Sequence, residues 1–385
     1  MSGRLPRLVR ATALAVGAVG TVGAVLVSAL PPAAAAPAVP AVPAPDERSV
    51  AELLTGLQRL YRETEEATET YNATEEKLNR RKAEVARLNG RLAAARLSLR
   101  DSRGAAGRLA RQQYQGASEI SPYLRLLFAR DPQHALDQGH VIRRVSRERA
   151  GTVERLAVGE RRAAGLARRA RTALDGQLAL AERQKKDRDL VRERLEDVEE
   201  LLASLTEEQL SRVAELERSG VAEAQDELVA SGALSSTRRP SRKGERALRH
   251  AVEQIGKPYE WGAEGPDAYD CSGLTSQAWG TAGHPIPRTS QEQWSELPRI
   301  ALTDLRPGDL VVYFPKATHV AIYLGDGLVV QAPRPHTRIK VSPVAANPVL
   351  GAVRPDPSAA SLRRYTPPKL PKDARAGSDE GNDTP

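Results

Sequence analysis

A single cysteine is the side chain with the clearest chemical potential in this sequence. Cys271 is the only cysteine of the chain, so no intramolecular disulfide can form. It follows Asp270, a residue type that favours the start of a helix. A cysteine in the first helical turn lies beside unpaired backbone N–H groups, which lower the pKa of its thiol. We therefore predict a reactive thiolate, with a buried and inert cysteine as the alternative.

His319 and Gln331 are the side chains that could complete a catalytic group with Cys271. A cysteine nucleophile needs a base to take its proton, and the base needs a third group to fix its tautomer. His319 starts one strand pattern, and Gln331 ends the next one after a turn at residues 325–327. A three-residue turn places both side chains on one face of the sheet, whereas a two-residue turn separates them. The spacing alone is weak evidence, because a histidine at a strand start is commonly a core residue.

The elements that must position these residues lie in the last third of the chain. Apolar spacing predicts a short helix over residues 247–255, and alternation predicts an antiparallel meander over 310–331. All three tryptophans fall between residues 261 and 294, and the packed core is expected around Trp261 to Tyr323. We predict a domain over residues 244–356, preceded by a polar linker over 233–243 and followed by a disordered tail over 357–385.

A long helical region is predicted over residues 49–232. Four apolar residues repeat at every seventh position and form a heptad seam: Leu78, Val85, Leu92 and Leu99. A second helical stretch runs from about Leu136 to Ala230. Because prolines interrupt the segment between the two stretches, an antiparallel hairpin is favoured over a parallel dimer, which needs one continuous register.

The segment between the two stretches carries a dense apolar patch. Its large side chains are Tyr123, Leu126, Leu127 and Phe128. Two interpretations stay open: the patch is local core that closes the turn, or it is a docking site for a partner.

The N-terminus has the parts of a secretory signal. Three arginines precede an uncharged apolar run over residues 11–30, and small residues follow at 33–36. We predict a signal peptide over residues 1–36 and a stiff Pro/Ala-rich spacer over 37–48. An uncleaved membrane anchor is the alternative, since the run is long enough to span a bilayer. Either interpretation places the rest of the chain outside the cytoplasm.

The net charge of +8 indicates anionic surroundings. Nucleic acid and an anionic cell wall are the two candidate partners by charge. The export signal argues against nucleic acid as the natural partner.

Five consecutive motifs carry a resemblance to a known family over about residues 245 to 355. They are Gly256-Lys257-Pro258-Tyr259-Glu260-Trp261-Gly262, Asp270-Cys271-Ser272-Gly273-Leu274, Pro287-Arg288-Thr289-Ser290, Leu305-Arg306-Pro307-Gly308-Asp309-Leu310 and His319-Val320-Ala321-Ile322-Tyr323-Leu324-Gly325. In order and spacing they resemble the NlpC/P60 peptidases. The resemblance implies a papain-like α+β fold and a cysteine endopeptidase of the cell wall. The bond expected to be cleaved lies between D-glutamate and the diamino acid of peptidoglycan stem peptides.

The resemblance also implies roles for individual residues. Cys271 is the expected nucleophile, His319 the base and Gln331 the orienting group, where the family more often has histidine or an acidic residue. Tyr259 is expected to support the oxyanion. The residues expected to bind substrate are Asp270, Ser272 and Arg288.

The whole architecture resembles secreted wall hydrolases with an N-terminal coiled coil. In such proteins the coiled coil often inhibits or recruits, and a membrane division complex releases the enzyme. The resemblance makes Leu126, Leu127 and Phe128 the expected docking residues for such a complex.

Two other function classes stay open. One is a wall-binding protein with a degenerate site, which only Gln331 favours. The other is an amidase or transpeptidase that uses the same thiol. No metal or other cofactor is expected, because no cluster has metal-ligand spacing.

Overall fold

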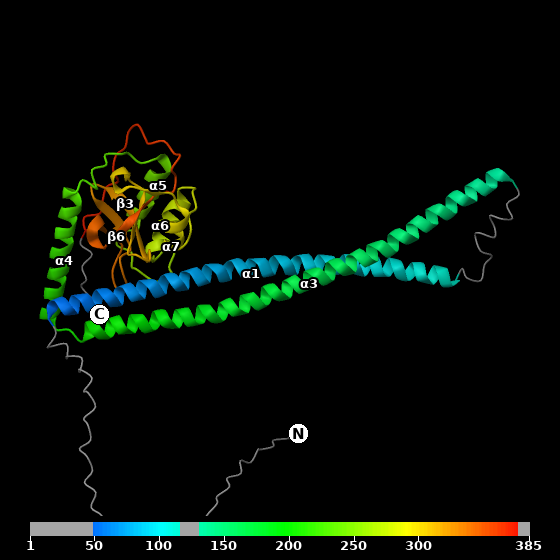
Figure 1. Ribbon diagram of the computed structural model, residues 1–385, viewed down its shortest axis with the longest axis horizontal. Helices are drawn as coiled ribbons and strands as arrows, with labels where there is room; N and C mark the ends of the chain where they lie inside the picture. The colour runs from blue at the N-terminus through cyan, green and yellow to red at the C-terminus, as the bar shows by residue number, and fades with distance from the viewer. Residues whose placement is uncertain (1–48, 116–130, 376–385) are drawn as a thin grey trace, which may run out of the picture. The chain divides into compact units, whose positions relative to one another are not determined.

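The computed structural model describes residues 49–115 and 131–375, which belong to one compact unit (Figure 1). The helices are α1 (Val50–Gln115), α3 (Pro132–Ala203), α4 (Glu207–Ala230), α5 (Arg242–Glu253), α6 (Cys271–Thr281) and α7 (Ser290–Glu296), with short 3₁₀ turns η3 (Leu302–Asp304) and η4 (Val344–Ala346). The strands are β1 (Arg299–Ile300), β2 (Leu310–Tyr313), β3 (His319–Gly325), β4 (Leu328–Gln331), β5 (Lys340–Pro343) and β6 (Val349–Val353).

The helices α1 and α3 lie side by side as an antiparallel hairpin (Figure 1). Asp131 begins α3 by accepting a hydrogen bond from the backbone N–H of His134 at 2.7 Å, with Pro132 as the first helical residue. From Val85 to Leu99, the predicted seam is buried against small and apolar residues of α3: Ala163, Leu166, Ala170 and Ala173. The partner surface is therefore intramolecular, as the hairpin prediction required.

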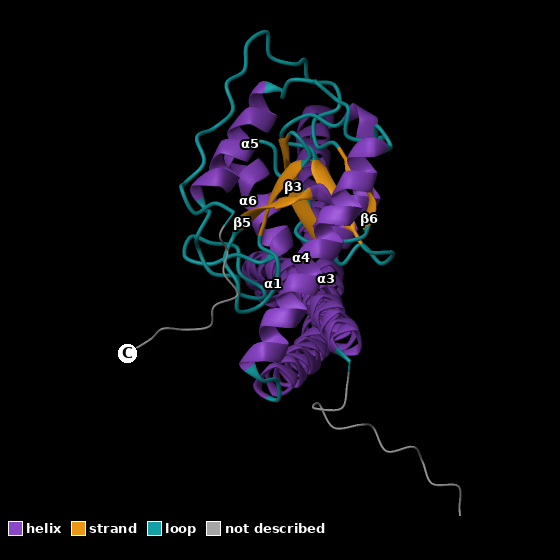
Figure 2. Cartoon of the chain, turned by 90° about the vertical axis from the view of Figure 1, so that its left-hand side faces the viewer, coloured by secondary structure: helices purple, strands orange, loops and turns teal. Residues whose placement is uncertain are grey.

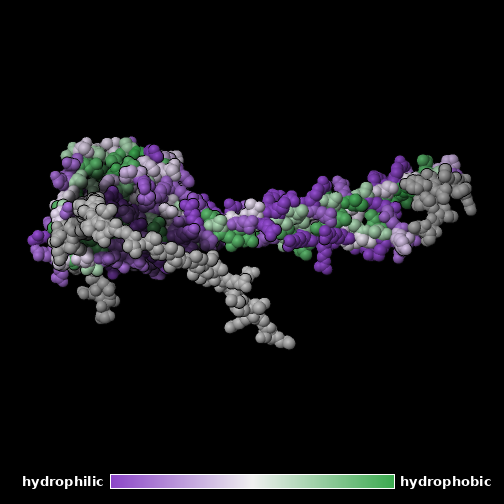
Figure 3. Space-filling view, turned by 60° about the horizontal axis from the view of Figure 1, so that its bottom comes forward, coloured by the Kyte–Doolittle hydropathy of each residue, from purple (hydrophilic) through white to green (hydrophobic). Residues whose placement is uncertain are grey.

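The surface of the hairpin is mostly hydrophilic, with hydrophobic patches between the polar side chains (Figure 3). The predicted tip, including Tyr123, Leu126, Leu127 and Phe128, lies outside the described residues. Within the described ranges, no helix is both long and apolar enough to span a membrane.

The second helical stretch, predicted from about Leu136 to Ala230, consists of two helices. The chain leaves the helix at Ser204, and Thr206 starts α4 with a capping box that it shares with Gln209. In the sequence, the seam of this stretch ends at Leu205 and resumes out of step at Val213, and the break between the two helices explains this shift. The new helix packs on the C-terminal domain, where the Gln225 amide donates to the Gly327 carbonyl at 3.1 Å.

The C-terminal domain is built on a six-stranded antiparallel sheet in the order β1-β6-β2-β3-β4-β5 (Figure 2). One face of the sheet packs with α5 and α6 around a core that includes Leu248, Leu274 and Trp279. The other face includes Tyr313 and packs against residues of α4 and the segment after it. The predicted α+β fold with a preceding helical hairpin is confirmed.

The turn between β3 and β4 has the register on which the catalytic prediction depends. Ile322 lies opposite Val330 and Tyr323 opposite Val329, with a bulge before Gly325. This pairing is the register of a three-residue turn, so His319 and Gln331 lie on one face, a diagonal step apart.

The tail predicted to be disordered is partly ordered. The backbone N–H of Val341 in the edge strand β5 donates to the Ala374 carbonyl at 2.8 Å, and Ala374 is buried. Leu362 donates to the Pro240 carbonyl at 2.8 Å, so the domain begins slightly before the expected residue 244. The backbone N–H and C=O groups on the open side of an edge strand need hydrogen-bond partners, and the tail supplies one for β5. Residues 376–385 lie outside the description.

Candidate active site

Cys271 is the first residue of α6, as its sequence context predicted. The Asp270 carboxylate caps the helix by accepting a hydrogen bond from the Gly273 backbone N–H at 2.6 Å. The backbone N–H of Val320, directly after His319, also interacts with the Cys271 thiol. The helix start and the first residues of β3 thus bring the cysteine and the histidine segments together.

His319 and Gln331 form the predicted contact across β3 and β4. The His319 Nε2 atom lies 2.7 Å from the Gln331 Oε1 atom, and both side chains are buried. Since an amide oxygen only accepts hydrogen bonds, Nε2 is the nitrogen that carries the proton. The Nδ1 atom of His319 is then left with a lone pair that can take a proton.

Asp270, Ser272 and Arg288 form a single hydrogen-bonded cluster beside the cysteine. The Arg288 guanidinium donates to both Asp270 carboxylate oxygens, at 3.0 and 2.7 Å, and to the Ser272 hydroxyl at 2.8 Å. Asp270 is fully buried, so this two-pronged ion pair satisfies a charge that burial would otherwise make costly. The three predicted substrate-binding residues are therefore one unit.

Tyr259 is buried in the same core as Cys271. Burial raises the pKa of its phenol well above the usual range, and the charge of a Cys271 thiolate raises it further. Tyr259 and Cys271 thus share one packed core, and the role of Tyr259 at the oxyanion stays a prediction.

Three residues of α1 that sequence reasoning missed lie in the site. The Glu69 carboxylate accepts hydrogen bonds from the Ser272 hydroxyl at 2.7 Å and from the Ser290 backbone N–H at 2.8 Å. Its Oε1 atom lies 3.9 Å from the Cys271 sulfur.

The other two missed residues flank Glu69 along the helix. Glu65 Oε1 lies 3.4 Å from His319 Nδ1, and the Asn72 amide donates to Asp270 Oδ2 at 3.0 Å. All three α1 side chains are buried.

A sequence signal for this segment does exist. Between Tyr61 and Leu78, no leucine, isoleucine or valine occurs, although the seam is regular on the C-terminal side. The buried side chains in this gap are mostly polar, which indicates a surface that contacts polar groups.

The prediction of a lowered thiol pKa was wrong for the described structure, in which α1 side chains bury Cys271. Burial raises the pKa of the Cys271 thiol well above its ordinary value, and the charges of Glu69, Asp270 and Glu65 raise it further. Burial also lowers the pKa of His319 to about 4. The described state therefore holds a neutral thiol beside a neutral imidazole.

The carboxyl groups of α1 respond to the same environment. Burial, followed by the charge of Asp270, raises the pKa of Glu69 to about 7. Burial and the charge of Glu69 raise the pKa of Glu65 well above its usual range. The closed site thus favours protonated carboxyl groups on α1.

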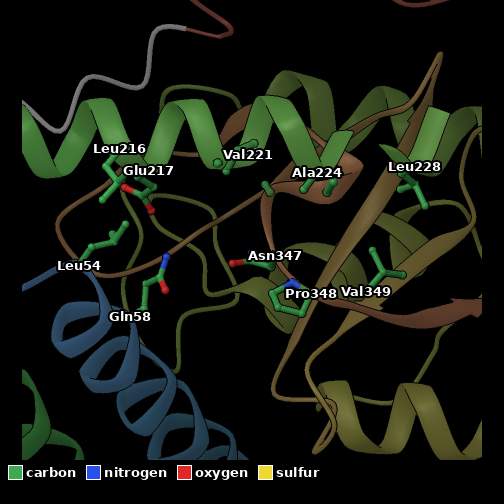
Figure 4. A pocket seen from close by; sticks show the side chains of 13 residues that line it. Leu54, Gln58, Leu216, Glu217, Val221, Ala224, Leu228, Asn347, Pro348 and Val349 are labelled. Carbon is green, nitrogen blue, oxygen red and sulfur yellow. The ribbon is translucent and has the colours of Figure 1, made fainter. Parts of the chain in front are cut away.

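An open groove lies away from these residues, between the first turns of α1, the helix α4 and the segment before β6 (Figure 4). Leu54, Leu216 and Val349 are among its lining residues, whereas Cys271 and His319 are not. In the part of the chain that the structure describes, no group of three or more His, Cys, Asp or Glu side chains is arranged to hold a metal ion.

Gly273 gives a stability prediction for the cysteine motif. A Cβ atom on Gly273 would overlap the backbone carbonyl oxygen of Ala263, which cannot move aside as a flexible side chain does. We expect Gly273→Ala to destabilise the domain by about 3 kcal/mol. The matched control is Gly280→Ala in the same helix, where a Cβ meets nothing within 4 Å. Thermal unfolding followed by circular dichroism measures both, and equal melting temperatures would contradict the prediction.

The C-terminal domain is similar in sequence to known proteins. Residues 256–351 match the model of the NlpC/P60 family. A protein of Corynebacterium glutamicum named probable endopeptidase is 44% identical over 111 residues, which are 29% of this chain and 53% of that protein. A probable endopeptidase of Mycobacterium tuberculosis is 37% identical over 108 residues, which are 28% of each chain. The chain thus spans about half, or less, of the length of these relatives.

A solved structure is also similar to part of the chain. The crystal structure of the NlpC/p60 domain of the peptidoglycan hydrolase SagA is 32% identical, covering 29% of this chain and 97% of that domain, with a TM-score of 0.28. The family match contains the cysteine, the histidine and the glutamine described above. Residues 256–351 of this chain are therefore similar to the NlpC/P60 family.

Proposed function

We propose that this protein is a cell-wall hydrolase that cleaves amide bonds in peptidoglycan stem peptides by a cysteine thiolate mechanism. The observation that carries the proposal is the 2.7 Å contact between His319 Nε2 and Gln331 Oε1. This contact fixes the imidazole as a base through Nδ1, on a sheet whose β3 also contributes the Val320 amide beside the Cys271 sulfur. The names of the relatives as endopeptidases support the same class of reaction.

In the proposed reaction, His319 takes the proton of the Cys271 thiol, and the sulfur attacks the carbonyl carbon of the amide. Tyr259 helps to hold the negative oxygen of the tetrahedral intermediate. When the C–N bond breaks, His319 gives its proton to the leaving amine and a thioester remains. Water, deprotonated by His319, then attacks the thioester, which releases a carboxylate and restores the thiol.

The proposed substrate contacts come from the cluster beside the cysteine. Asp270 and Ser272 are assigned to the amino end of the peptide, and Arg288 keeps both side chains in place through its three hydrogen bonds. We assign the cleaved bond to the D-glutamyl–diamino acid linkage.

The proposal includes export and a partner. A signal peptide over residues 1–36 would carry the enzyme to the cell wall, and a membrane division complex would dock at Leu126, Leu127 and Phe128. The outer half of the hairpin supports such a contact, because large apolar side chains there are exposed: Leu97, Tyr114, Leu136, Val141 and Val153.

Hydrolysis of a synthetic stem peptide tests the activity. The full chain lacking residues 1–36 is incubated with L-Ala-γ-D-Glu-diamino acid peptides, and mass spectrometry identifies the products. We expect L-Ala-D-Glu to be released, and Cys271→Ala to abolish the release. A product of a different mass would indicate that another bond reacts, as in an amidase or transpeptidase. No product, even when the thiol is accessible to alkylation, would favour the non-catalytic alternative.

A further inference from the structure

The two halves of the hairpin formed by α1 and α3 differ strongly in charge. The inner half, residues 50–79 and 179–203, has nine Lys and Arg residues against fifteen Asp and Glu residues, a net charge of −6. The outer half, residues 80–115 and 132–178, has twenty Lys and Arg residues against seven Asp and Glu residues, a net charge of +13. Anions are therefore attracted to the outer half of the hairpin and repelled by the inner half.

Most of the cations on the outer half lack a partner of opposite charge. On an ordinary solvated helix face, Arg and Lys pair with carboxylates three or four positions away. All of the twenty cations except Arg81 are exposed, and within the described residues four of them are in ion pairs: Arg80, Arg81, Arg103 and Arg144. Because the other sixteen repel one another, a bound polyanion would stabilise this surface.

An open groove between α1 and α3 lies on this outer half. Its volume is about 610 Å³, which falls within the range of ligand-binding clefts, about 300–1,000 Å³. Arg96, Arg100 and Arg103 line the groove from α1, and their spacing of four and then three positions places them on one helix face over about 10 Å. Ala163 and Ala167 of α3 also line it, and these small side chains leave the groove open.

We propose that this groove binds a linear anionic polymer through the phosphate groups of that polymer, at a site separate from the catalytic residues. The guanidinium group of arginine matches the oxygens of a phosphate, and a row of three suits a chain whose phosphates repeat. A groove between two helices admits a single chain, whereas a flat lipid bilayer touches only the ridges of the helices. The bound polymer would hold the enzyme in place while the C-terminal domain acts on its own substrate.

Glu160 of α3 is the one carboxylate among the residues that line the groove. Its Oε1 atom accepts a hydrogen bond from Arg103 at 3.1 Å, and the side chains of Arg103 and Glu160 are 63% and 50% exposed. Exposed ion pairs of this kind are weak, so a phosphate group can displace the carboxylate. Glu160→Gln removes this competitor and should tighten polymer binding by about 3- to 10-fold. A hairpin that failed to fold could not produce such a gain.

The binding experiment uses the full chain lacking residues 1–36 and poly(glycerol phosphate) with a fluorophore at one end. Fluorescence anisotropy measures the dissociation constant at about 50 and 200 mM salt. Arg96→Gln/Arg100→Gln/Arg103→Gln should weaken binding by about 10- to 100-fold and should reduce the slope of log K against log salt by about 2, because three phosphate contacts are lost. Glutamine is as good a helix former as arginine, and circular dichroism verifies that the helical content is unchanged.

The matched control is Arg87→Gln/Arg91→Gln/Arg108→Gln. It removes the same three charges from exposed positions in the outer half of α1 that do not line the groove, and it should weaken binding by less than about 3-fold. Equal losses in the two triple variants would mean that charge alone attracts the polymer, and would overturn the groove as a site. Binding to phosphatidylglycerol vesicles without binding to the soluble polymer would overturn the polymer as the ligand, as would the absence of any binding.

Discussion

His319→Ala should lower kcat/KM for stem-peptide cleavage by about 1,000-fold. The imidazole has two tasks in the proposed reaction, since it takes the thiol proton and returns it to the leaving amine, and general acid–base catalysis contributes about 10² to 10⁴. The measurement is made in a chain with Glu69→Ala and Asn72→Ala, because these two side chains contact Ser272 and Asp270 in the described site.

Gln331 supplies the matched comparison for this effect. Gln331→Ala removes the acceptor of the His319 Nε2–H and should cost about 10- to 100-fold, because the ring loses its orientation but stays in the site. Gln331→Glu preserves the acceptor and adds a charge that favours the imidazolium. The kcat/KM of the Gln331→Glu chain should stay near that of the chain with Gln331. The acidic limb of its pH profile should move to higher pH, because the added charge raises the pKa of His319. Unchanged activity in His319→Ala would exclude His319 as the base.

Local chemistry explains what the sequence predicted well. The helix start at Asp270 and Cys271 depends on one capping side chain, and the antiparallel strands depend on alternation over a few residues. The register of His319 against Gln331 depends on the length of one turn. Each of these features is decided within about a dozen residues, so the printed sequence contains the needed information.

Features that depend on distant partners were not predictable in the same way. Glu69 and Ser272 are 203 positions apart, and no local rule pairs a helix face with a catalytic domain. The gap in the apolar seam between Tyr61 and Leu78 indicates that another surface contacts α1, but not which one. Similarly, the composition of the tail favoured disorder, while its order comes from pairing with the edge strand β5.

Negative charges near Cys271 keep the pKa of its thiol raised, so their removal should lower this pKa. Three like charges contribute to it after burial: Glu69, Asp270 and Glu65. A nearby negative charge disfavours the thiolate, so removing carboxylates must lower the pKa. Replacing both α1 carboxyl groups, in Glu65→Gln/Glu69→Gln, should therefore lower the thiol pKa by about 1 to 3 units.

The absorbance of the thiolate at 240 nm, recorded against pH, measures this shift. Because Cys271 is the only cysteine, subtracting the titration of the matching Cys271→Ala chain removes the contribution of the tyrosines. In the unmodified chain the thiol should ionise well above its ordinary value of 9.0, whereas in the double glutamine chain it should ionise at lower pH. Glu76→Ala removes a carboxylate of α1 that pairs with Arg80 of the same helix, and it should titrate like the unmodified chain. Identical titrations in all three would mean that the charges of α1 do not act on the sulfur, and that burial alone keeps the nucleophile neutral.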